Sequence, residues 1–337
     1  MSQDLEHMDL RQTDFGQTDF EQTVASHRRE LLAHCYRMLG SAPDAEDAVQ
    51  ETMLRAWRSF GVFDPRRASA RTWLYRIATN VCLSALGRRG GRSLPARIVE
   101  PSTDPGEPFA RGDNMRWVEP FPDASGTGIG QDPADASAAR GSLRLAFVAA
   151  IQYLPPRQRA VLILRDVLQF SAAETAEILD ATPVAVNSAL QRAHARMAQV
   201  AVVEDDVAEP ATVADRAVIE RYITAFENSD IAALTLLLTD DVVLEMPPML
   251  NWFHGRANYG LFIERVCRMR GPRWHLVQTS ANGQPAVGAY VLDSDGVFRA
   301  HSIQVFSVFD GLIGHNVVYQ NTELFGLFGL SDTASVA

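Results

Sequence analysis

The chain has 337 residues, 47% of them hydrophobic, which suits two or three folded domains and excludes a largely disordered protein. Its formal net charge is −10, and all 31 of its cationic residues are arginine. The three cysteines, Cys35, Cys82 and Cys267, stand far apart, so we expect a reducing cytoplasm and neither a disulfide framework nor a metal site. The first 27 residues carry six acids and one arginine, unlike a signal peptide, and no apolar run approaches the length of a membrane span.

Charge is distributed unevenly along the chain. Two blocks are basic, with net charges of +7 for residues 28–97 and +3 for residues 139–200. Three blocks are acidic, with −5 for residues 1–27, −6 for residues 98–138 and −9 for residues 201–337. We therefore expect nucleic-acid contact in the two basic blocks only.

The first basic block follows an acidic tail, residues 1–25, which contains the near-repeat RQTDFGQTDFEQT and is predicted to be disordered. A helix is expected over 26–40, with Gly40 as its C-cap. A second helix is expected over 43–60, beginning with Pro43 and Asp44. The side chains expected to form its core stripe are Ala45, Ala48, Val49, Thr52, Met53, Ala56 and Trp57.

A second face of the 43–60 helix carries a leucine among charged and amide side chains: Asp47, Gln50, Glu51, Leu54 and Arg58. This pattern is compatible with a solvated face and with a docking surface for another protein. From the residues alone the solvated face is favoured, because single exposed leucines are common.

Residues 61–71 are expected to form a loop with three arginines, and residues 72–89 a helix. The side chains predicted to be buried in that helix are Trp73, Leu74, Ile77, Val81, Cys82 and Ala85, and those predicted to face the other way are Thr72, Arg76, Thr79, Asn80 and Leu83. The arginines that follow, at 88, 89 and 92, suit phosphates. Trp73 and Tyr75 suit unstacked bases, with a core position the alternative for Trp73.

The second basic block ends in two short helices joined by a tight turn, over residues 171–198. Ser171 and Glu174 form a capping box, and Thr182 caps a second helix that starts at Pro183. The core face of the second helix carries Val186, Leu190 and Ala193, and its other face carries Asn187, Ser188, Gln191, Arg192 and Arg196. The pattern indicates a DNA-binding helix-turn-helix, with an ordinary helical hairpin as the alternative. Helices over 142–154 and 157–168 support it, and Arg157 and Arg159 are placed to touch phosphate.

Two acidic linkers separate the folded parts, residues 98–139 and 201–213. The first is longer than a simple domain joint. It carries one stretch suited to contact another surface, Arg116–Trp117–Val118–Glu119–Pro120. A lone anchoring tryptophan is the alternative explanation of that stretch.

The last part of the chain, residues 214–331, has an α+β pattern. Helices are expected over 215–228, after Asp230, and over 257–268. Strands are expected over 241–246, 273–281, 285–292, 301–309 and 312–320, with hairpin turns at Asn282-Gly283 and Asp310-Gly311. We expect a curved antiparallel sheet covered by helices.

Three stretches closely resemble the extracytoplasmic-function (ECF) group of bacterial RNA polymerase sigma factors: AEDAVQETMLRAW, RTWLYRIATNVCLSALGRR and LPPRQRAVLILRDVLQFSAAETAEIL…PVAVNSALQRA. The resemblance implies two all-α domains, sigma region 2 over 26–97 and the region 4 helix-turn-helix over 140–200. It implies that they bind core RNA polymerase and promoter DNA. One departure is the turn Asp180–Ala181–Thr182, where family members usually have a glycine.

The resemblance also assigns residues to roles. Asp47, Gln50, Glu51, Leu54 and Arg58 would dock on the coiled coil of the largest polymerase subunit, which reverses the preference for a solvated face, and the polymerase flap region is a further implied partner. The residues implied for capture and melting of the −10 element are Arg66, Arg67, Arg71, Arg76, Thr79, Asn80, Arg88 and Arg89. Those implied for the −35 element are Thr182, Val184, Asn187, Ser188, Gln191, Arg192 and Arg196. The linker would thread the polymerase RNA channel, and its tryptophan–proline stretch resembles one in sigma factors with an extra carboxy-terminal domain.

The segment VIERYITAFENSDIAALTLLLTDDVVLEMPP, with Trp252, Gly255 and the closing hairpins, resembles the SnoaL-like branch of the nuclear-transport-factor-2 (NTF2) superfamily. The implied fold is a cone over 214–331, with a pocket between sheet and helices that could take a small molecule. The residues expected to line it, or to form plain core, are Tyr222, Phe226, Met246, Trp252, His254, Trp274, Gln304 and Tyr319.

Enzymatic chemistry is the weaker of two hypotheses. Glu245, His254 and His301 are candidates for a proton shuttle of the cyclase or isomerase type, but one sequence shows no two of them converging. The sequence shows no phosphate loop, metal cluster or nucleophile motif, and no cofactor is expected. We therefore favour a sigma factor that its SnoaL-like domain regulates in cis over an enzyme fused to DNA-binding modules. The promoter, the pocket ligand and the existence of an anti-sigma factor are left open.

Overall fold

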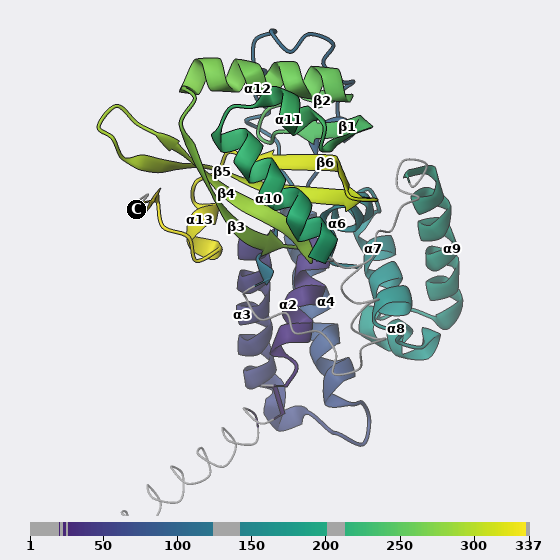
Figure 1. The fold of residues 1–337 in the computed structure, drawn as a ribbon. Coiled ribbons are helices and arrows are strands. Elements are labelled where there is room, and N and C mark those ends of the chain that lie inside the picture. Colours follow the sequence, from purple (N-terminus) through teal and green to yellow (C-terminus); the bar gives the residue numbers. More distant parts are fainter. Residues whose placement is uncertain (1–19, 21–22, 25, 124–141, 201–212, 335–337) are drawn as a thin grey trace, which may run out of the picture. The chain divides into compact units, whose positions relative to one another are not determined.

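The computed structural model in Figure 1 describes residues 20, 23–24, 26–123, 142–200 and 213–334. Their contacts divide into two compact units. The first unit contains the described residues up to 90 together with residues 154–199. The second unit contains residues 91–123, 142–153 and the described residues from 200 onward. The segment between the two helical domains, and the helix that follows it, therefore belong to the same unit as the carboxy-terminal domain.

The amino-terminal half of the first unit is a helical bundle. Its helices are α2 (Arg28–Leu39), α3 (Ala42–Ser59), η1 (Phe60–Val62) and α4 (Ala70–Arg89), and they pack against one another. Gly40 ends α2 in the left-handed conformation, as predicted. The side chains of Ser41 and Ser69 accept backbone N–H groups at the starts of α3 and α4.

Two predictions about the edge of this bundle are wrong. Trp57 is not a core residue but is exposed, because its ring lies beside Phe20 and not inside the bundle. The predicted tail also reaches the fold at its end, since Val24 is buried and Phe20 contacts both Trp57 and Phe60. The repeat residues before position 20 lie outside the described part of the chain.

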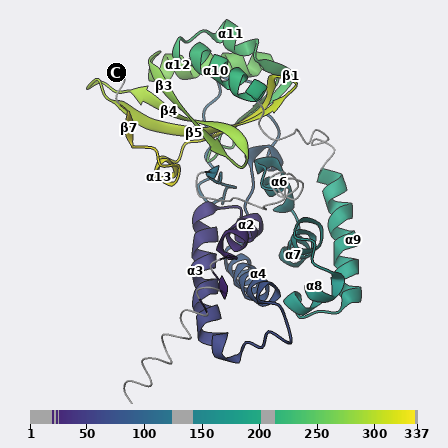
Figure 2. The same cartoon turned by 60° about the horizontal axis from the view of Figure 1, so that its bottom comes forward.

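The other half of the first unit holds α7 (Pro156–Leu162), the π-helical turn η4 (Ile163–Val167), α8 (Ala172–Leu179) and α9 (Pro183–Val200). The predicted capping box is formed: Ser171 Oγ accepts the N–H of Glu174, and the Glu174 carboxylate accepts the N–H of Ser171. Asp180 makes the turn in the left-handed region, at φ 50°. Helices α7 and α8 pack against α4, and α7 also packs against α2, within this unit (Figure 2).

The second unit is an α+β fold whose helices α10 (Val213–Glu227), α11 (Ile231–Thr235) and α12 (Arg256–Arg270) cover one face of a sheet (Figures 1 and 2). The strands are β1 (Leu238–Glu245), β2 (Trp252–His254), β3 (Trp274–Ala281), β4 (Gln284–Leu292), β5 (Phe298–Phe309), β6 (Leu312–Tyr319) and β7 (Thr333–Ala334). The described residues of this unit also include the short helices η2 (Pro95–Arg97), α6 (Leu145–Ile151) and α13 (Leu324–Leu327).

The sheet runs in the order β2-β1-β6-β5-β4-β3, with β7 paired to β5. The expectation of an antiparallel sheet is wrong at one place, because β1 and β6 pair in parallel across the middle of the fold. The chain can make this pairing because α12 and four strands separate β1 from β6 in sequence. Both predicted hairpin turns are present, with Asn282 at φ 60° and Asp310 at φ 49° ahead of their glycines.

In the part of the chain that the structure describes, none of the helices is both long enough and apolar enough to cross a lipid bilayer.

Candidate nucleic-acid and polymerase interfaces

The predicted polymerase-docking face of α3 lies on the surface of the helical bundle. Asp47, Gln50, Leu54 and Arg58 are exposed, and Leu54 shows 51% of its surface. Glu51 is half-buried and pairs with Arg55 on the next turn, with Arg55 Nε 2.7 Å from Glu51 Oε1. The opposite face buries Ala45, Ala48, Val49, Thr52 and Ala56 in the bundle. The exposed face of α3 therefore carries a leucine flanked by carboxylates.

Some of the side chains predicted for the −10 surface are exposed, and others are not. Arg66, Arg67, Arg76 and Asn80 are exposed on the loop and on α4, and the last turn of α4 exposes Arg88 and Arg89. Arg89 already has an acidic neighbour, since its Nη1 lies 2.9 Å from Asp44 Oδ1. Trp73 is half-buried and stacks on Phe63 with ring centroids 4.6 Å apart. The aromatic pair therefore borders the arginine loop.

Two residues expected on this surface lie in the core instead. Thr79 is fully buried, and its Oγ1 is 2.9 Å from His34 Nε2 on α2. Tyr75 is also fully buried, with its hydroxyl donating to Glu30 at 3.3 Å. Burial raises the pKa of Tyr75 above its ordinary value. Neither side chain reaches DNA in this conformation, because α4 packs against helices on more than one side.

The predicted −35 helix, α9, presents its polar face to solvent. Thr182, Val184, Asn187, Gln191, Arg192 and Arg196 are exposed, and Ser188 is half-buried. Val186 and Ala193 are buried on the opposite face, as predicted. Thr182 Oγ1 accepts the N–H of Ala185 at 3.2 Å and so caps the helix. The amide side chains therefore lie near the amino-terminal end of the helix and the arginines further along, an order suited to base edges and then phosphates.

Arg159 does not join these surfaces. Its side chain is 1% exposed, and its guanidinium donates to the carbonyl oxygens of Met38 and Leu154. Burial lowers its pKa to about 10, so the group stays charged at neutral pH. The expectation that Arg159 touches phosphate is therefore wrong for this conformation, whereas Arg157 is exposed.

In the second unit, residues 96–112 run along the α+β domain as a belt, a name used below for this segment. The N–H of Ala96 donates to Glu245 Oε2 at 2.7 Å, and the Trp252 indole donates to the carbonyl of Val99 at 2.9 Å. The N–H of Ser102 donates in return to the carbonyl of Trp252 at 2.8 Å. The edge strand β2 and the end of β1 thus hold the first half of the belt.

Asn251 and Arg265 hold the second half of the belt. The buried Asn251 amide accepts the N–H of Ala110 at 2.7 Å and donates to the Glu107 carboxylate at 2.8 Å. Arg265 Nη1 donates to the carbonyl of Glu107 at 2.7 Å, and its guanidinium lies 4.6 Å from the centre of the Phe109 ring. Sequence reasoning missed these anchors, because nothing local to Asn251 or Arg265 refers to a segment more than 140 residues earlier.

The stretch around Trp117 is held in the same unit. Arg92 Nη1 donates to the carbonyl of Trp117 at 2.6 Å and pairs with Glu119 Oε1 at 3.1 Å. Val118 is fully buried. Arg92 was expected to bind phosphate together with Arg88 and Arg89, but its guanidinium is instead bonded to the linker.

The β3–β4 hairpin turn bonds to the linker and to the segment that follows it. Asn282 Oδ1 accepts the N–H of Phe121 at 2.9 Å, and Asn282 Nδ2 donates to the carbonyl of Leu143 at 2.6 Å. The next residues act in the same way: Gly283 N–H donates to Asp123, and Gln284 Oε1 accepts the N–H of Leu145 at 2.9 Å. Two turn residues and a strand residue therefore fix the segments on both sides of residues 124–141.

The interior of the cone contains a closed polar cluster. The Tyr222 hydroxyl is 3.1 Å from both the Tyr259 hydroxyl and Gln304 Oε1, and Asn316 Nδ2 donates to Tyr259 at 2.7 Å and to Gln304 at 3.2 Å. All four side chains are buried. Burial raises the pKa of Tyr259 to about 12. Of the residues predicted to line a pocket, this cluster brings together Tyr222 and Gln304.

The other predicted pocket residues are distributed over the domain. Phe226 and Trp274 pack edge to face in the core at 5.4 Å, and Met246 and Tyr319 are buried. Trp252 and His254 lie on the edge strand β2, where Trp252 holds the belt and His254 is exposed.

The three candidates for proton transfer have separate surroundings. Glu245 is buried, with the belt on one carboxylate oxygen and His315 Nε2 3.0 Å from the other. His301 lies edge to face against Trp274, and burial lowers its pKa to about 4. Within the described residues no group of three or more His, Cys, Asp or Glu could hold a metal ion.

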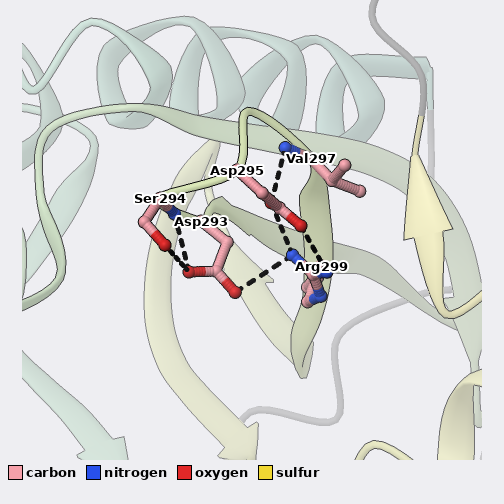
Figure 3. A network of polar contacts seen from close by, with 5 residues as sticks. All are labelled: Asp293, Ser294, Asp295, Val297 and Arg299. Carbon is pink, nitrogen blue, oxygen red and sulfur yellow. Dashed lines mark hydrogen bonds and ion pairs between the residues drawn. The ribbon is translucent and has the colours of Figure 1, made fainter.

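The β4–β5 connection carries an exposed ionic network (Figure 3). Arg299 Nη1 is 3.0 Å from Asp293 Oδ2, and Arg299 Nη2 is 2.7 Å from Asp295 Oδ2. The Arg299 guanidinium holds the pKa of Asp295 at about 2. All three side chains are in solvent, so we read the network as a fastening of the loop onto β5.

Comparison with known proteins agrees with this architecture. A family model described as Sigma-70 region 2 matches residues 23–92, and one described as Sigma-70, region 4 matches residues 144–197. A model described as a SnoaL-like domain matches residues 219–315. The chain belongs to the ECF family of RNA polymerase sigma factors, which are non-enzymatic transcription initiation factors that recognise promoters with RNA polymerase. The predicted fold class, two helical sigma regions followed by an α+β SnoaL-like domain, is confirmed.

Among its relatives is the ECF RNA polymerase sigma factor SigG of Mycobacterium tuberculosis, to which the chain is 44% identical over 312 residues, 91% of this chain and 82% of SigG. SigJ of the same organism is 28% identical over 298 residues, 85% of this chain and 86% of SigJ. The crystal structure of SigJ shares the fold, with a TM-score of 0.61 at 24% identity over 93% of this chain and 99% of the SigJ chain.

Proposed function

We propose that this sigma factor uses three surfaces in initiation. The exposed α3 face of Asp47, Gln50, Glu51, Leu54 and Arg58 docks on the largest polymerase subunit. The arginine loop with Arg76, Asn80, Arg88 and Arg89 captures and melts the −10 element, and the polar face of α9 reads the −35 element. The exposure of most of these side chains supports the assignment, with Glu51 and Ser188 half-buried, and Thr79 leaves the −10 set because it is buried.

Substitution separates the first two surfaces. Leu54→Ala with Asp47→Ala should weaken co-elution with core polymerase, whereas Arg76→Ala with Asn80→Ala should keep co-elution and abolish open-complex formation. Loss of base or phosphate contacts costs about 1–3 kcal/mol each, roughly tenfold to a hundredfold in affinity. Ser84→Ala, exposed on the same helix as Asn80, is the matched control. Equal effects of both pairs on core binding would contradict the division of roles.

The SnoaL-like domain acts in cis, and the observation that supports this is the belt. The linker that is expected to thread the polymerase RNA channel is bonded to the carboxy-terminal domain. The residues of that domain which hold it are Glu245, Asn251, Trp252 and Arg265. The domain thereby controls how far the linker can move. Residues 201–337, which comprise the second linker and the domain, carry a net charge of −9, opposite in sign to the basic promoter-binding blocks.

Loosening the belt in the full-length protein tests this regulation. Asn251→Ala leaves buried belt groups without partners, at a cost of about 1–3 kcal/mol, and should speed tryptic cleavage after Arg111. Transcription with core polymerase should then change in rate or promoter choice, while Arg268→Ala, exposed on α12, leaves both as in the wild type. If tryptic cleavage after Arg111 is faster but transcription is unchanged at low and high salt, regulation through the linker is excluded.

A further inference from the structure

The first unit contains a contact that the three proposed surfaces do not explain. Arg71, in the first turn of α4, lies between the two sigma regions. Its Nε is 3.1 Å from Glu30 Oε2 of α2, and its Nη2 donates to the carbonyl of Leu168 at 3.4 Å. Its guanidinium lies 4.3 Å from the centre of the Phe170 ring and 5.2 Å from that of Tyr75. A side chain assigned to DNA is therefore occupied by a carboxylate, a carbonyl and two aromatic faces.

Phe170 is the region 4 partner in this contact. It is 2% exposed and meets Tyr75 edge to face at 5.1 Å, directly before the capping box that starts α8. Its own N–H donates to the carbonyl of Leu164 at 2.9 Å, and its carbonyl accepts Arg165, so its backbone is fixed. A rigid segment of region 4 thus inserts a phenyl ring against the start of the helix that carries Asn80.

A second contact reinforces the same closed arrangement. The buried guanidinium of Arg159, on α7, donates to the carbonyl of Met38 at the end of α2. Separation of α7 from α2 would leave that carbonyl and the guanidinium to water. The two contacts lie on different helices of each region, so together they resist both sliding and hinging.

The closed arrangement is incompatible with a promoter-bound protein. The −10 and −35 elements are about 25 base pairs apart, roughly 80 Å along DNA, whereas α8 packs directly on α4 in this unit. We propose that Arg71 is a dual-use residue. In the free protein Glu30 of region 2 holds its guanidinium against Leu168 and Phe170 of region 4, which latches the two regions together. On initiation Arg71 leaves these partners for the DNA backbone. The part played on DNA depends on the −10 assignment above, whereas the latch in the free protein does not.

Spin-label distances in the full-length protein test the latch. Labels at Ser84→Cys on α4 and Ala198→Cys on α9 occupy exposed positions, in a Cys267→Ser background because Cys35 and Cys82 are buried. The wild type should give a single narrow distance that lengthens when core polymerase and promoter DNA are added. Phe170→Ala removes the ring and should raise the open-to-closed ratio of the free protein by about tenfold or more.

Two further variants guard against misfolding. Phe170→Leu keeps most of the burial but removes the aromatic face. Glu30→Gln removes the carboxylate that holds the Arg71 guanidinium in place within region 2. Both variants should shift the distance distribution partly toward the open arrangement. Glu177→Gln, exposed on α8, should behave as wild type. The latch would be overturned if the free wild-type protein gave a label-to-label distance distribution as broad as that of Phe170→Ala. It would also be overturned if the wild type kept the short distance on promoter DNA. Co-elution with core polymerase is scored separately, so failure of the sigma assignment is told apart from failure of the latch.

Discussion

One buried histidine of the helical bundle is paired with a threonine on a neighbouring helix. His34 on α2 is fully buried with its Nε2 2.9 Å from Thr79 Oγ1, and burial together with Arg37 and Arg71 lowers its pKa to about 3. An ordinary histidine titrates near 6.5. His34 is therefore neutral in the folded bundle and would be protonated in the unfolded chain at mildly acidic pH.

The sign of the resulting pH dependence follows from that difference. Above about pH 6.5 neither state binds the proton, and stability is full; as pH falls toward 3 the unfolded state gains a proton that the folded state refuses. Stability should fall by about 1.4 kcal/mol per pH unit in that window. His34→Gln, which retains a partner for Thr79 and does not titrate there, should flatten the curve measured by urea unfolding between pH 7 and pH 5. Parallel curves for the two proteins would contradict the assignment.

At the residue scale, the sequence predicted which helix faces are exposed better than it predicted the burial of single side chains. Asn80 and Arg76 are exposed as predicted, whereas Thr79 and Arg159 are buried. Periodicity describes one buried stripe per helix, but α4 is packed by α2, α3, α7 and α8. The direction of Thr79 depended on a histidine 45 residues away, which local spacing does not reveal.

At the scale of elements, the helix-turn-helix shows how a local departure is accommodated. The turn lacks the usual glycine, and Asp180 adopts φ 50° instead. Aspartate tolerates the left-handed region better than most residues. Its backbone N–H donates to Glu177, and that of Ala181 donates to the carbonyl of Ala176 at 2.9 Å, so the helix end is satisfied.

Asp180→Gly should therefore be neutral or stabilise the first unit by up to about 1 kcal/mol, because glycine carries no penalty at positive φ. Asp180→Val should destabilise it by about 1–2 kcal/mol, because a β-branched side chain clashes there. Thermal unfolding of both variants in full-length protein gives the comparison, and affinity for a −35 duplex shows whether α9 keeps its orientation. Equal melting temperatures for Gly and Val would show that the turn does not hold this conformation.

Element types were predictable where local chemistry marks their ends. The capping box at Ser171, the C-cap at Gly40 and the two hairpin turns mark real boundaries. The edge strand β2 was not predicted, because its three residues exist as a strand only through pairing with β1. The parallel β1–β6 pair was missed for a related reason: strand order follows from long-range pairing, not from the alternation within each strand.

At the scale of the whole molecule, segments that are far apart in the sequence belong to the same folded unit. The linker between the sigma regions is bonded to the SnoaL-like domain. The β3–β4 turn bonds to the linker at Phe121 and to the start of the following segment at Leu143. One hairpin thereby sets the position of both segments that flank residues 124–141.

Asn282→Gly isolates the side-chain part of that junction, since glycine retains the positive φ of the turn while removing the amide. The Phe121 N–H, which donates to Asn282 Oδ1, should lose protection in hydrogen exchange, while N–H groups inside the β4–β5 pair keep theirs. Loss of these bonds from a buried site should cost about 1–3 kcal/mol of local stability. Retained protection at Phe121 would show that the backbone alone holds the linker.

The sequence by itself determined the domain types, their order, most helices and hairpins, and the surfaces on which Leu54, Asn80 and the α9 amides stand. These features depend on caps, turns and apolar spacing within about 20 residues of chain. The tertiary structure alone decided that Arg71 and Arg159 join the two sigma regions and that Asn251, Arg265 and Asn282 hold the linker. Those contacts pair groups about 100 or more residues apart, and a hydrogen-bonding or charged side chain carries no local sign of which distant partner will satisfy it.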